Sequence, residues 1–330
     1  MSTVGPIQPA TQIPLIDVAA SLGGDLSARR AVAEQIGAAA RDLGFFYVTN
    51  HGVDEALIRE QLAFTRRFFA MPASKKDAIG LEFSTCTRGY ERLGAQVLDE
   101  ASPPDLKESF LMSRDLPPSH PYVSGGVPNY GPNQWPVLEG FREQMEAYYQ
   151  ALAGLELAMM RALALSLALP EDYFDAMYDE PMSILRILHY PPAAAGMDER
   201  RLGAGAHTDW GMLTFLLQDE VGGLEVLRPD GVWVPATPIP GSFVVNLGDM
   251  ITRMTNGLYH STMHRVRANR ADRDRYSVAF FGEPCHFAEI KVLGACVTQG
   301  DGARFSSCTV GEHLVQMQDK TYGRTPVPAA

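Results

Sequence analysis

The sequence is poor in cysteine and in positive charge, and it has no long uninterrupted apolar run. Only four cysteines occur in 330 residues, and their spacing matches no zinc-binding or paired redox motif. We therefore expect free thiols in a reducing, cytoplasmic protein. The chain has 28 basic and 39 acidic residues, a net charge of −11. With no dense stripe of lysine and arginine, this charge excludes nucleic acid and anionic membrane surfaces as expected partners.

Targeting and membrane signals are also missing from the sequence. The first 15 residues lack the basic and apolar regions of a secretion signal. The most apolar stretch, residues 151–169, contains Glu156 and Arg161, so we expect a buried helix rather than a membrane span. The remaining composition is that of a globular protein with a large core. It leaves the oligomeric state open.

The first half of the chain predicts helices, short strands and long loops. A strand over 13–17 and a strand over 45–50 flank a helix that Ser27 would cap and Gly44 would end. A second helix is expected over 55–69. The region that follows, residues 80–136, is rich in glycine, proline, serine and asparagine, which is typical of loops that form walls of binding sites. Arg88 and Lys107 lie in these loops and are expected to be solvated.

The second half changes from helix to strand. Residues 137–169 carry a continuous apolar stripe at helical spacing. After Pro181, eight strand-like runs are separated by turn residues, a pattern of a β-sandwich or jelly roll. We expect a helical region packed against a C-terminal barrel, with a last helix over 311–320. The predicted division is an N-terminal mixed region, 1–136, and a long helix plus β core, 137–330, which together form one catalytic unit.

Candidate chemistry begins with His207 and Asp209 in the segment AHTDWGMLTFLLQ. Side chains two positions apart on a strand share one face, so we expect the imidazole and the carboxylate to project together from one strand. With one more histidine they would form the two-histidine, one-carboxylate set that binds non-haem Fe(II) and leaves positions open for oxygen chemistry. The spacing alone is weak evidence, because about one such pair is expected by chance.

Two histidines compete for the third position, His260 and His264. Four residues along a strand span about 13 Å, so both cannot bind the same ion. The turn over 268–274 and the run RYSVAFF predict a hairpin in which His264 lies opposite Ser277. In that register Arg275 faces the same cavity.

An inward-facing arginine is costly unless an anion meets it. A guanidinium binds a carboxylate through two parallel hydrogen bonds, and a hydroxyl two residues away adds a third. Arg275 and Ser277 therefore predict an anchor for a dicarboxylate or a carboxylated substrate. The alternative is an ordinary ion pair between Arg275 and a loop acid, Asp272 or Asp274.

The motifs of the whole chain match a known family. The chain resembles the isopenicillin N synthase-like family of Fe(II) dioxygenases, most of which use 2-oxoglutarate. The resemblance covers nearly the whole chain and rests on motifs in both halves. They are IPLID, ARDLGFFYVTNHGV, FFAMPASKK, RGY, LRILHYPP, AHTDWGMLTFLLQDEVGGLEV, NLGDMITRMTNGLYHSTMHRV and RYSVAFF.

The resemblance implies a mainly β fold with flanking helices and a distorted double-stranded β-helix, or jelly-roll, core. It implies Fe(II) held by His207, Asp209 and His264, since the family's ligand is the histidine of the HRV triplet. It further implies 2-oxoglutarate as co-substrate, O2 as oxidant and release of succinate and CO2. A small organic substrate would be hydroxylated, desaturated or cyclised, with no catalytic side chain beyond the metal ligands.

The resemblance also implies the surroundings of the co-substrate. Arg275 and Ser277 match the pair that binds the distal carboxylate of 2-oxoglutarate, and Tyr190 matches a tyrosine that assists there. The usual plant pattern has asparagine where this chain has Leu188. Two further positions match those that line the substrate cavity, Phe281 and Leu216.

Two alternative functions stay open at this point. An oxidase similar to isopenicillin N synthase itself would act without 2-oxoglutarate, and Arg275 and Ser277 would bind the substrate carboxylate. A non-catalytic carboxylate-binding protein on the same fold is the second alternative. Neither the substrate nor the kind of oxidation can be read from the residues.

Overall fold

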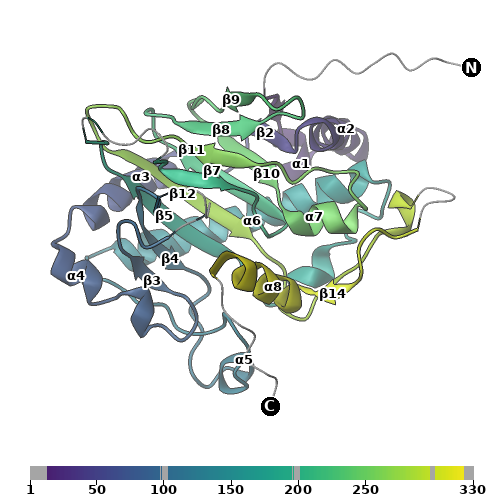
Figure 1. Cartoon of the computed structure of the whole chain (residues 1–330). Helices are drawn as coiled ribbons and strands as arrows, with labels where there is room; N and C mark the ends of the chain where they lie inside the picture. The colour runs from purple at the N-terminus through teal and green to yellow at the C-terminus, as the bar shows by residue number, and fades with distance from the viewer. Residues whose placement is uncertain are drawn as a thin grey trace, which may run out of the picture.

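The computed structural model describes residues 13–96, 98, 103–194, 196, 201–297 and 302–322. Two facing sheets, a short strand pair and the surrounding helices make up the fold (Figure 1). The larger sheet has the strand order β1 (Leu15–Asp17), β2 (Phe45–Thr49), β10 (Phe243–Leu247), β7 (Leu213–Gln218), β12 (Arg275–Gly282), β5 (Ile184–Tyr190), β4 (Glu108–Met112), β3 (Gly89–Glu91). The smaller sheet has the order β6 (Ala204–His207), β11 (His264–Val266), β8 (Leu224–Leu227), β9 (Trp233–Pro235). The pair is β13 (Glu289–Ile290) with β14 (Cys308–Thr309).

Helices cover the outer face of the larger sheet. The α-helices are α1 (Ala19–Gly23), α2 (Leu26–Asp42), α3 (Glu55–Phe69), α4 (Ala73–Asp77), α5 (Pro121–Ser124), α6 (Phe141–Ser166), α7 (Asp249–Met254) and α8 (Val310–Tyr322). Three 3-10 helices are η1 (Leu81–Phe83), η2 (Asp175–Tyr178) and η3 (Gly294–Cys296). The long helix α6 packs on β12 and contacts α2 and α3.

Alternation along β12 separates two apolar clusters. Val278 and Phe280 point outward into the cluster shared with α6, where Phe280 meets the ring of Tyr149. Ala279 and Phe281 point the other way, into a second cluster between the two sheets. Strand side chains alternate between faces, so every second residue of β12 faces the space inside the jelly roll. The predicted mainly β, jelly-roll fold with flanking helices is confirmed.

The helices and strands predicted in the first half from local sequence signals are present, but the predicted start of one helix is wrong. α2 begins after Asp25, whose side chain accepts a hydrogen bond from the amide of Ala28, so the predicted cap at Ser27 is wrong. Asp25 is the better cap because its carboxylate reaches the free amide of the first turn. Gly44 ends the helix with φ +70°, where a side chain would overlap the carbonyl of His260.

The second half departs from the prediction at two places. Helix α7 was not predicted, because its six residues are too short to show a helical period. The expected strand over HFAEIKV is reduced to the two residues of β13. The predicted last helix is present as α8, and Gly311 in it packs so closely on the ring of His286 that a side chain would clash.

Arg88 and Lys107 were expected on the solvated surface, and this prediction is wrong. Their exposed fractions are 1% and 3%. Lys107 forms a buried ion pair with Asp105, and Arg88 donates hydrogen bonds to backbone carbonyls, among them that of Asn129. The loops over 80–136 fold back on themselves and supply these partners, which no local pattern reveals.

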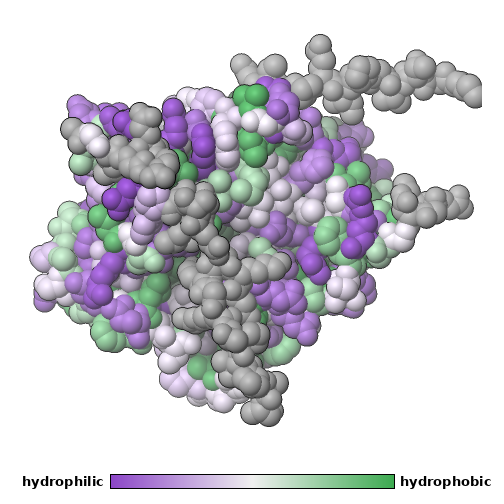
Figure 2. All heavy atoms as spheres, in the orientation of Figure 1, coloured by the Kyte–Doolittle hydropathy of each residue, from purple (hydrophilic) through white to green (hydrophobic). Residues whose placement is uncertain are grey.

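Other predictions concern the chain as a whole. The four cysteines are free. In the described part of the chain, no helix has the length and apolar character needed to cross a membrane. Hydrophilic and hydrophobic side chains are interspersed over the face shown in Figure 2. The division at residue 136 stays a prediction, and β1–β4, which precede it, share one sheet with strands that follow it. The tail beyond residue 322 lies outside the described residues.

Candidate metal centre

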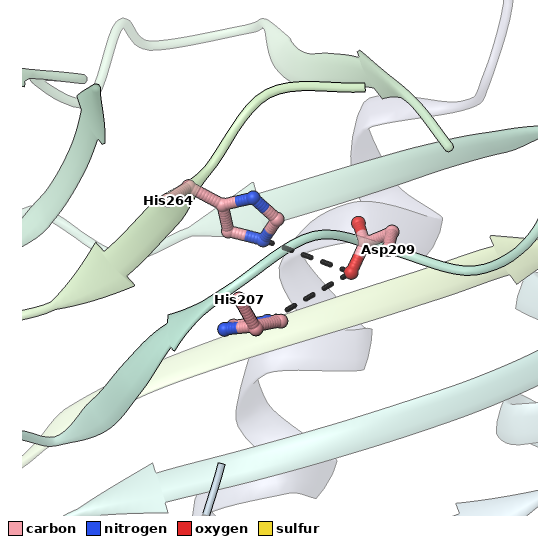
Figure 3. A group of neighbouring side chains, drawn as sticks. All are labelled: His207, Asp209 and His264. Carbon is pink, nitrogen blue, oxygen red and sulfur yellow. Dashed lines mark ion pairs between the residues drawn. The ribbon is translucent and has the colours of Figure 1, made fainter. Parts of the chain in front are cut away.

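Three side chains from two neighbouring strands and one loop converge on a common point (Figure 3). His207 ends β6 and His264 begins β11, and the two residues are direct partners in the antiparallel pairing. Asp209 lies in the loop between β6 and β7, so the prediction that it shares a strand with His207 is wrong. The ligand atoms of the three lie within 4.8 Å of one another. The Nε2 atoms of His207 and His264 are 3.8 Å and 3.6 Å from Oδ1 of Asp209.

Hydrogen bonds to the atoms that face away from the common point orient each of the three side chains. The Nδ1 atoms of His207 and His264 lie 2.7 Å and 3.1 Å from the carbonyl oxygens two residues before them, those of Gly205 and Thr262. A ring that donates from Nδ1 keeps the lone pair of Nε2 free for a metal. Oδ2 of Asp209 accepts hydrogen bonds from the Thr214 hydroxyl at 2.6 Å and the Asn246 amide at 2.7 Å. Its Oδ1 is the oxygen directed towards the two imidazoles.

The electrostatics keep His207 and Asp209 in the protonation states that a metal requires. Burial and the neighbouring His264 lower the pKa of His207 far below its ordinary value, so this imidazole is neutral at physiological pH. Burial acts to raise the pKa of Asp209. The two imidazoles and the hydrogen bonds from Asn246 and Thr214 outweigh burial, and that pKa is lowered.

The donor set fits Fe(II). Two imidazoles and one carboxylate on one side of a common point form the facial arrangement of non-haem iron oxygenases. With metal–ligand bonds of about 2.1 Å, adjacent ligand atoms lie about 3 Å apart. The separations between the two Nε2 atoms and Oδ1 of Asp209 exceed this by less than 1 Å. The competing histidine, His260, is exposed and is not part of the cluster.

The predicted hairpin between the strand of His264 and the strand of Arg275 is wrong. β11 pairs with β6 and β8, whereas β12 pairs with β5 and β7 in the other sheet. The turn residues between them carry the chain from one sheet to the other, and a turn signal does not specify the partner of the next strand. Both strands nevertheless direct apolar side chains, Val266 of β11 and Ala279 of β12, into the same cluster between the sheets. The common cavity of His264, Arg275 and Ser277 stays a prediction.

Arg275 is preorganised on the inner face. It is 1% exposed, its Nε donates to the carbonyl of Gly222, and its two Nη atoms donate to Ser277 Oγ at 3.3 Å and Gln218 Oε1 at 3.1 Å. Its guanidinium carbon lies 4.5 Å from the centre of the Tyr190 ring. The alternative ion pair with a loop acid is not seen among the described residues, and Asp274 instead meets His189 at 2.9 Å.

The remaining predicted residues share this inner face. Leu188 and Tyr190 on β5 are buried in the cluster between the sheets. Leu216 on β7 and Phe281 on β12 pack against the same cluster but are only half-buried. The lining of a substrate cavity by these two residues stays a prediction. Sequence reasoning missed Asn246 and Gln218, although a polar residue within a buried strand such as FVVNL is a signal for an inward-facing hydrogen bond.

Comparisons with known proteins agree with this geometry. Residues 13–137 match the family model of the non-haem dioxygenase in morphine synthesis N-terminal region, and residues 181–284 match the 2OG-Fe(II) oxygenase superfamily. A 2-oxoglutarate-Fe(II) type oxidoreductase of Emericella nidulans is 37% identical over 95% of this chain and 91% of that protein. A homoarginine-6-hydroxylase of Arabidopsis thaliana is 38% identical over 86% of this chain and 87% of that protein.

A solved structure with a similar fold supports the same family. A full-length Neurospora crassa protein, solved in complex with alpha-KG and thymine, has a TM-score of 0.83 and 30% sequence identity, and the match covers 94% of this chain and 97% of that one. The cluster of His207, Asp209 and His264 agrees with these matches. The chain therefore belongs to the isopenicillin N synthase-like family of 2-oxoglutarate/Fe(II)-dependent oxygenases.

Proposed function

We propose that His207, Asp209 and His264 bind the Fe(II) of this oxygenase, and that Arg275 and Ser277 bind the distal carboxylate of its co-substrate, 2-oxoglutarate. The observation that carries the proposal is the convergence of the triad beside an inner face that holds a buried, preorganised guanidinium. A carboxylate that binds to such an arginine compensates its buried positive charge and accepts its free hydrogen bonds. Tyr190 completes the anchor by stacking under the guanidinium.

The residues of the chain orient the metal ligands and exclude water from the site. Bound Fe(II) and 2-oxoglutarate activate O2 with release of succinate and CO2, and this supplies the oxidant for the substrate. Thr214 and Asn246 fix one oxygen of Asp209 and leave the other for the metal. The apolar side chains of Leu188 and Ala279, buried between the sheets, keep water from this part of the site.

The substrate is proposed to be a small organic molecule that enters beside Leu216 and Phe281 and is hydroxylated, desaturated or cyclised. Both side chains support this because they face the inside and remain partly open. The relatives whose names state a substrate act on homoarginine, and solved relatives hold thymine or jasmonate, all of them small molecules. We further propose a cytoplasmic location on the ground of the four free thiols.

The residue assignment is tested by Fe(II) titration under anaerobic conditions with 2-oxoglutarate present, followed through the visible charge-transfer absorbance. His207→Ala, Asp209→Ala and His264→Ala should each abolish or severely weaken binding. His260→Ala is the matched control, because this exposed histidine lies outside the cluster, and it should bind Fe(II) as the wild type does. Equal loss in the control would contradict the assignment.

Succinate release during turnover separates the alternatives. Oxidation without succinate would favour an oxidase similar to isopenicillin N synthase, with Arg275 and Ser277 on the substrate carboxylate. Failure to bind Fe(II) at all would favour a non-catalytic carboxylate-binding protein. The matches to 2-oxoglutarate enzymes over nearly the whole chain support succinate formation.

A further inference from the structure

We infer that Glu283 determines substrate specificity by accepting a hydrogen bond from a substrate nitrogen that carries a hydrogen, as in an amine, a guanidinium or a ring N–H. The inference rests on the proposed function, since it places this carboxylate in the same interior space as the metal and the co-substrate anchor. It names a chemical class of substrate, which neither the triad nor the anchor determines.

The position of Glu283 follows from the alternation along β12. Arg275, Ser277, Ala279 and Phe281 occupy the inner face, and Glu283 is the next residue in this series, one position beyond the end of the strand. Its backbone is fixed, because its amide donates to the Ser183 hydroxyl at 3.1 Å and its carbonyl accepts from the amide of Met182 at 3.0 Å.

The side chain of Glu283 lies over the loop that carries Asp209. Gly211, two residues beyond Asp209, has no side chain, and a Cβ built on it would lie 3.2 Å from Cγ of Glu283. The amide of Met212, the next residue, donates to the carbonyl of Gly282. Glu283 therefore packs against the loop that carries Asp209, beyond the end of β12 that is opposite to Arg275.

The carboxyl group of Glu283 has no hydrogen-bond or ion-pair partner among the described residues. It is 7% exposed, yet within the described ranges no hydrogen bond or ion pair reaches its oxygens. The other inward charges of the neighbouring strands are paired, Arg186 with Glu91 and Lys107 with Asp105. A buried polar group without a partner is costly and calls for a specific explanation, such as a ligand that satisfies it.

The surrounding charges favour a donor rather than an anion. Burial raises the pKa of Glu283 to about 8, although the nearby guanidinium of Arg88 acts in the opposite direction. Glu156 and Asp209 act with burial, so Glu283 lies among carboxyl groups. Arg88 directs its hydrogen bonds to backbone carbonyls and does not pair with it. With a pKa of about 8, the Glu283 carboxyl group is mostly protonated at neutral pH before a substrate binds. Its carbonyl oxygen can accept a hydrogen bond from an N–H group, and a positively charged N–H group would also stabilise the ionised form.

The test uses pairs of small molecules that differ in the N–H group alone. Uracil, δ-valerolactam and pentylamine are each compared with the form in which every N–H is replaced by N–CH3, trimethylpentylammonium in the last case. Substrate-dependent succinate release is measured with the Fe(II)-loaded wild-type chain. We expect turnover with at least one N–H compound and a kcat/KM about 10- to 100-fold lower for its methylated partner, the range of one hydrogen bond to a charged group.

Variants show whether Glu283 is the residue responsible. Glu283→Gln keeps the shape and should lower kcat/KM for the N–H compound and reduce the preference over its methylated partner. Glu156→Gln is the matched control, because Glu156 is also a buried carboxyl group but accepts a hydrogen bond from Ser183 on the α6 side of the sheet. Glu156→Gln should keep the preference for the N–H compound over its methylated partner. It should also keep the basal release of succinate that is measured in the absence of substrate.

The inference is overturned if N–H and methylated partners are turned over equally, if only methylated compounds are turned over, or if no N–H compound supports turnover. An unchanged preference in Glu283→Gln would also overturn it, and the comparison of compounds with the wild type does not depend on how that variant folds. The anaerobic Fe(II) titration reports separately on the proposed function. A chain that binds Fe(II) and 2-oxoglutarate but shows no N–H preference refutes this inference alone.

Discussion

Replacement of Arg275 by glutamine should weaken 2-oxoglutarate binding far more than it slows turnover. An arginine has five N–H donors. Three of those of Arg275 already donate to Gly222, Ser277 and Gln218, which leaves two for a carboxylate. Each hydrogen bond to a charged group contributes about 1.5–3 kcal/mol, so the loss of two costs about 3 kcal/mol or more. This corresponds to a dissociation constant about 100-fold higher or more.

The assay for this variant is anaerobic titration of the Fe(II)-loaded protein with 2-oxoglutarate, together with the KM from succinate formation. Arg267→Gln is the control, because Arg267 is an arginine that directly follows β11 in the smaller sheet, and its side chain is 60% exposed and paired with Glu225. We expect it to bind 2-oxoglutarate within about 2-fold of the wild type, since exposed ion pairs contribute little. A change of less than about 3-fold in Arg275→Gln would refute the assignment of the anchor.

Three further perturbations follow from other contacts. Asn246→Ala removes a hydrogen bond to Asp209 and should weaken Fe(II) binding about 10- to 100-fold in the anaerobic titration. Burial acts to raise the pKa of Glu108, but hydrogen bonds from three neighbours lower it from 4.5 to about 2. A carboxyl group whose pKa is lowered in the folded state stabilises the fold at pH values above its ordinary pKa, and this stabilisation is lost as the pH falls towards the lowered pKa. The free energy of unfolding should therefore fall by up to about 3 kcal/mol as the pH drops from about 5 to 2. Glu108→Gln should remove most of this pH dependence in chemical denaturation. Gly311→Ala should expose the C-terminal helix to limited proteolysis, whereas Gly302→Ala, which has open space at its Cβ, should not.

The residue types of the metal centre could be predicted from the sequence, but the way the backbone brings them together could not. The HxD spacing was interpreted as two side chains on one strand. β6 instead ends at His207, and the following loop returns Asp209 to the same point. Both backbone paths satisfy the same spacing, so the pattern identifies the pair without identifying its conformation. Thr214 on β7, which holds the loop through a hydrogen bond, is five residues from Asp209, whereas Asn246 on β10 is 37 residues away and outside the segment.

The errors elsewhere have a common physical origin in tertiary structure. Turn residues after His264 predicted a hairpin, yet the partner of β11 is β6, more than 50 residues earlier in the chain. Arg88 and Lys107 were expected to be solvated, because charged side chains are seldom buried. Their partners are a loop carboxylate and backbone carbonyls supplied by folding of the same loops. Periodicity records which face of a strand is apolar, and it does not record which distant element covers that face.

The order of residues along β12 connects the anchor, the interior and the specificity proposal. Arg275 and Ser277 stand at its start, Ala279 faces the apolar interior, and Phe281 and Glu283 stand at its far end beside the loop of Asp209. Co-substrate and substrate must meet at the metal from different directions, because both cannot occupy the same side of it. A single strand that presents a cation at one end and a carboxylate at the other can sort the two by charge. On the proposed assignments, the distal carboxylate of 2-oxoglutarate pairs with Arg275, and an N–H group of the substrate donates to the carboxyl group of Glu283.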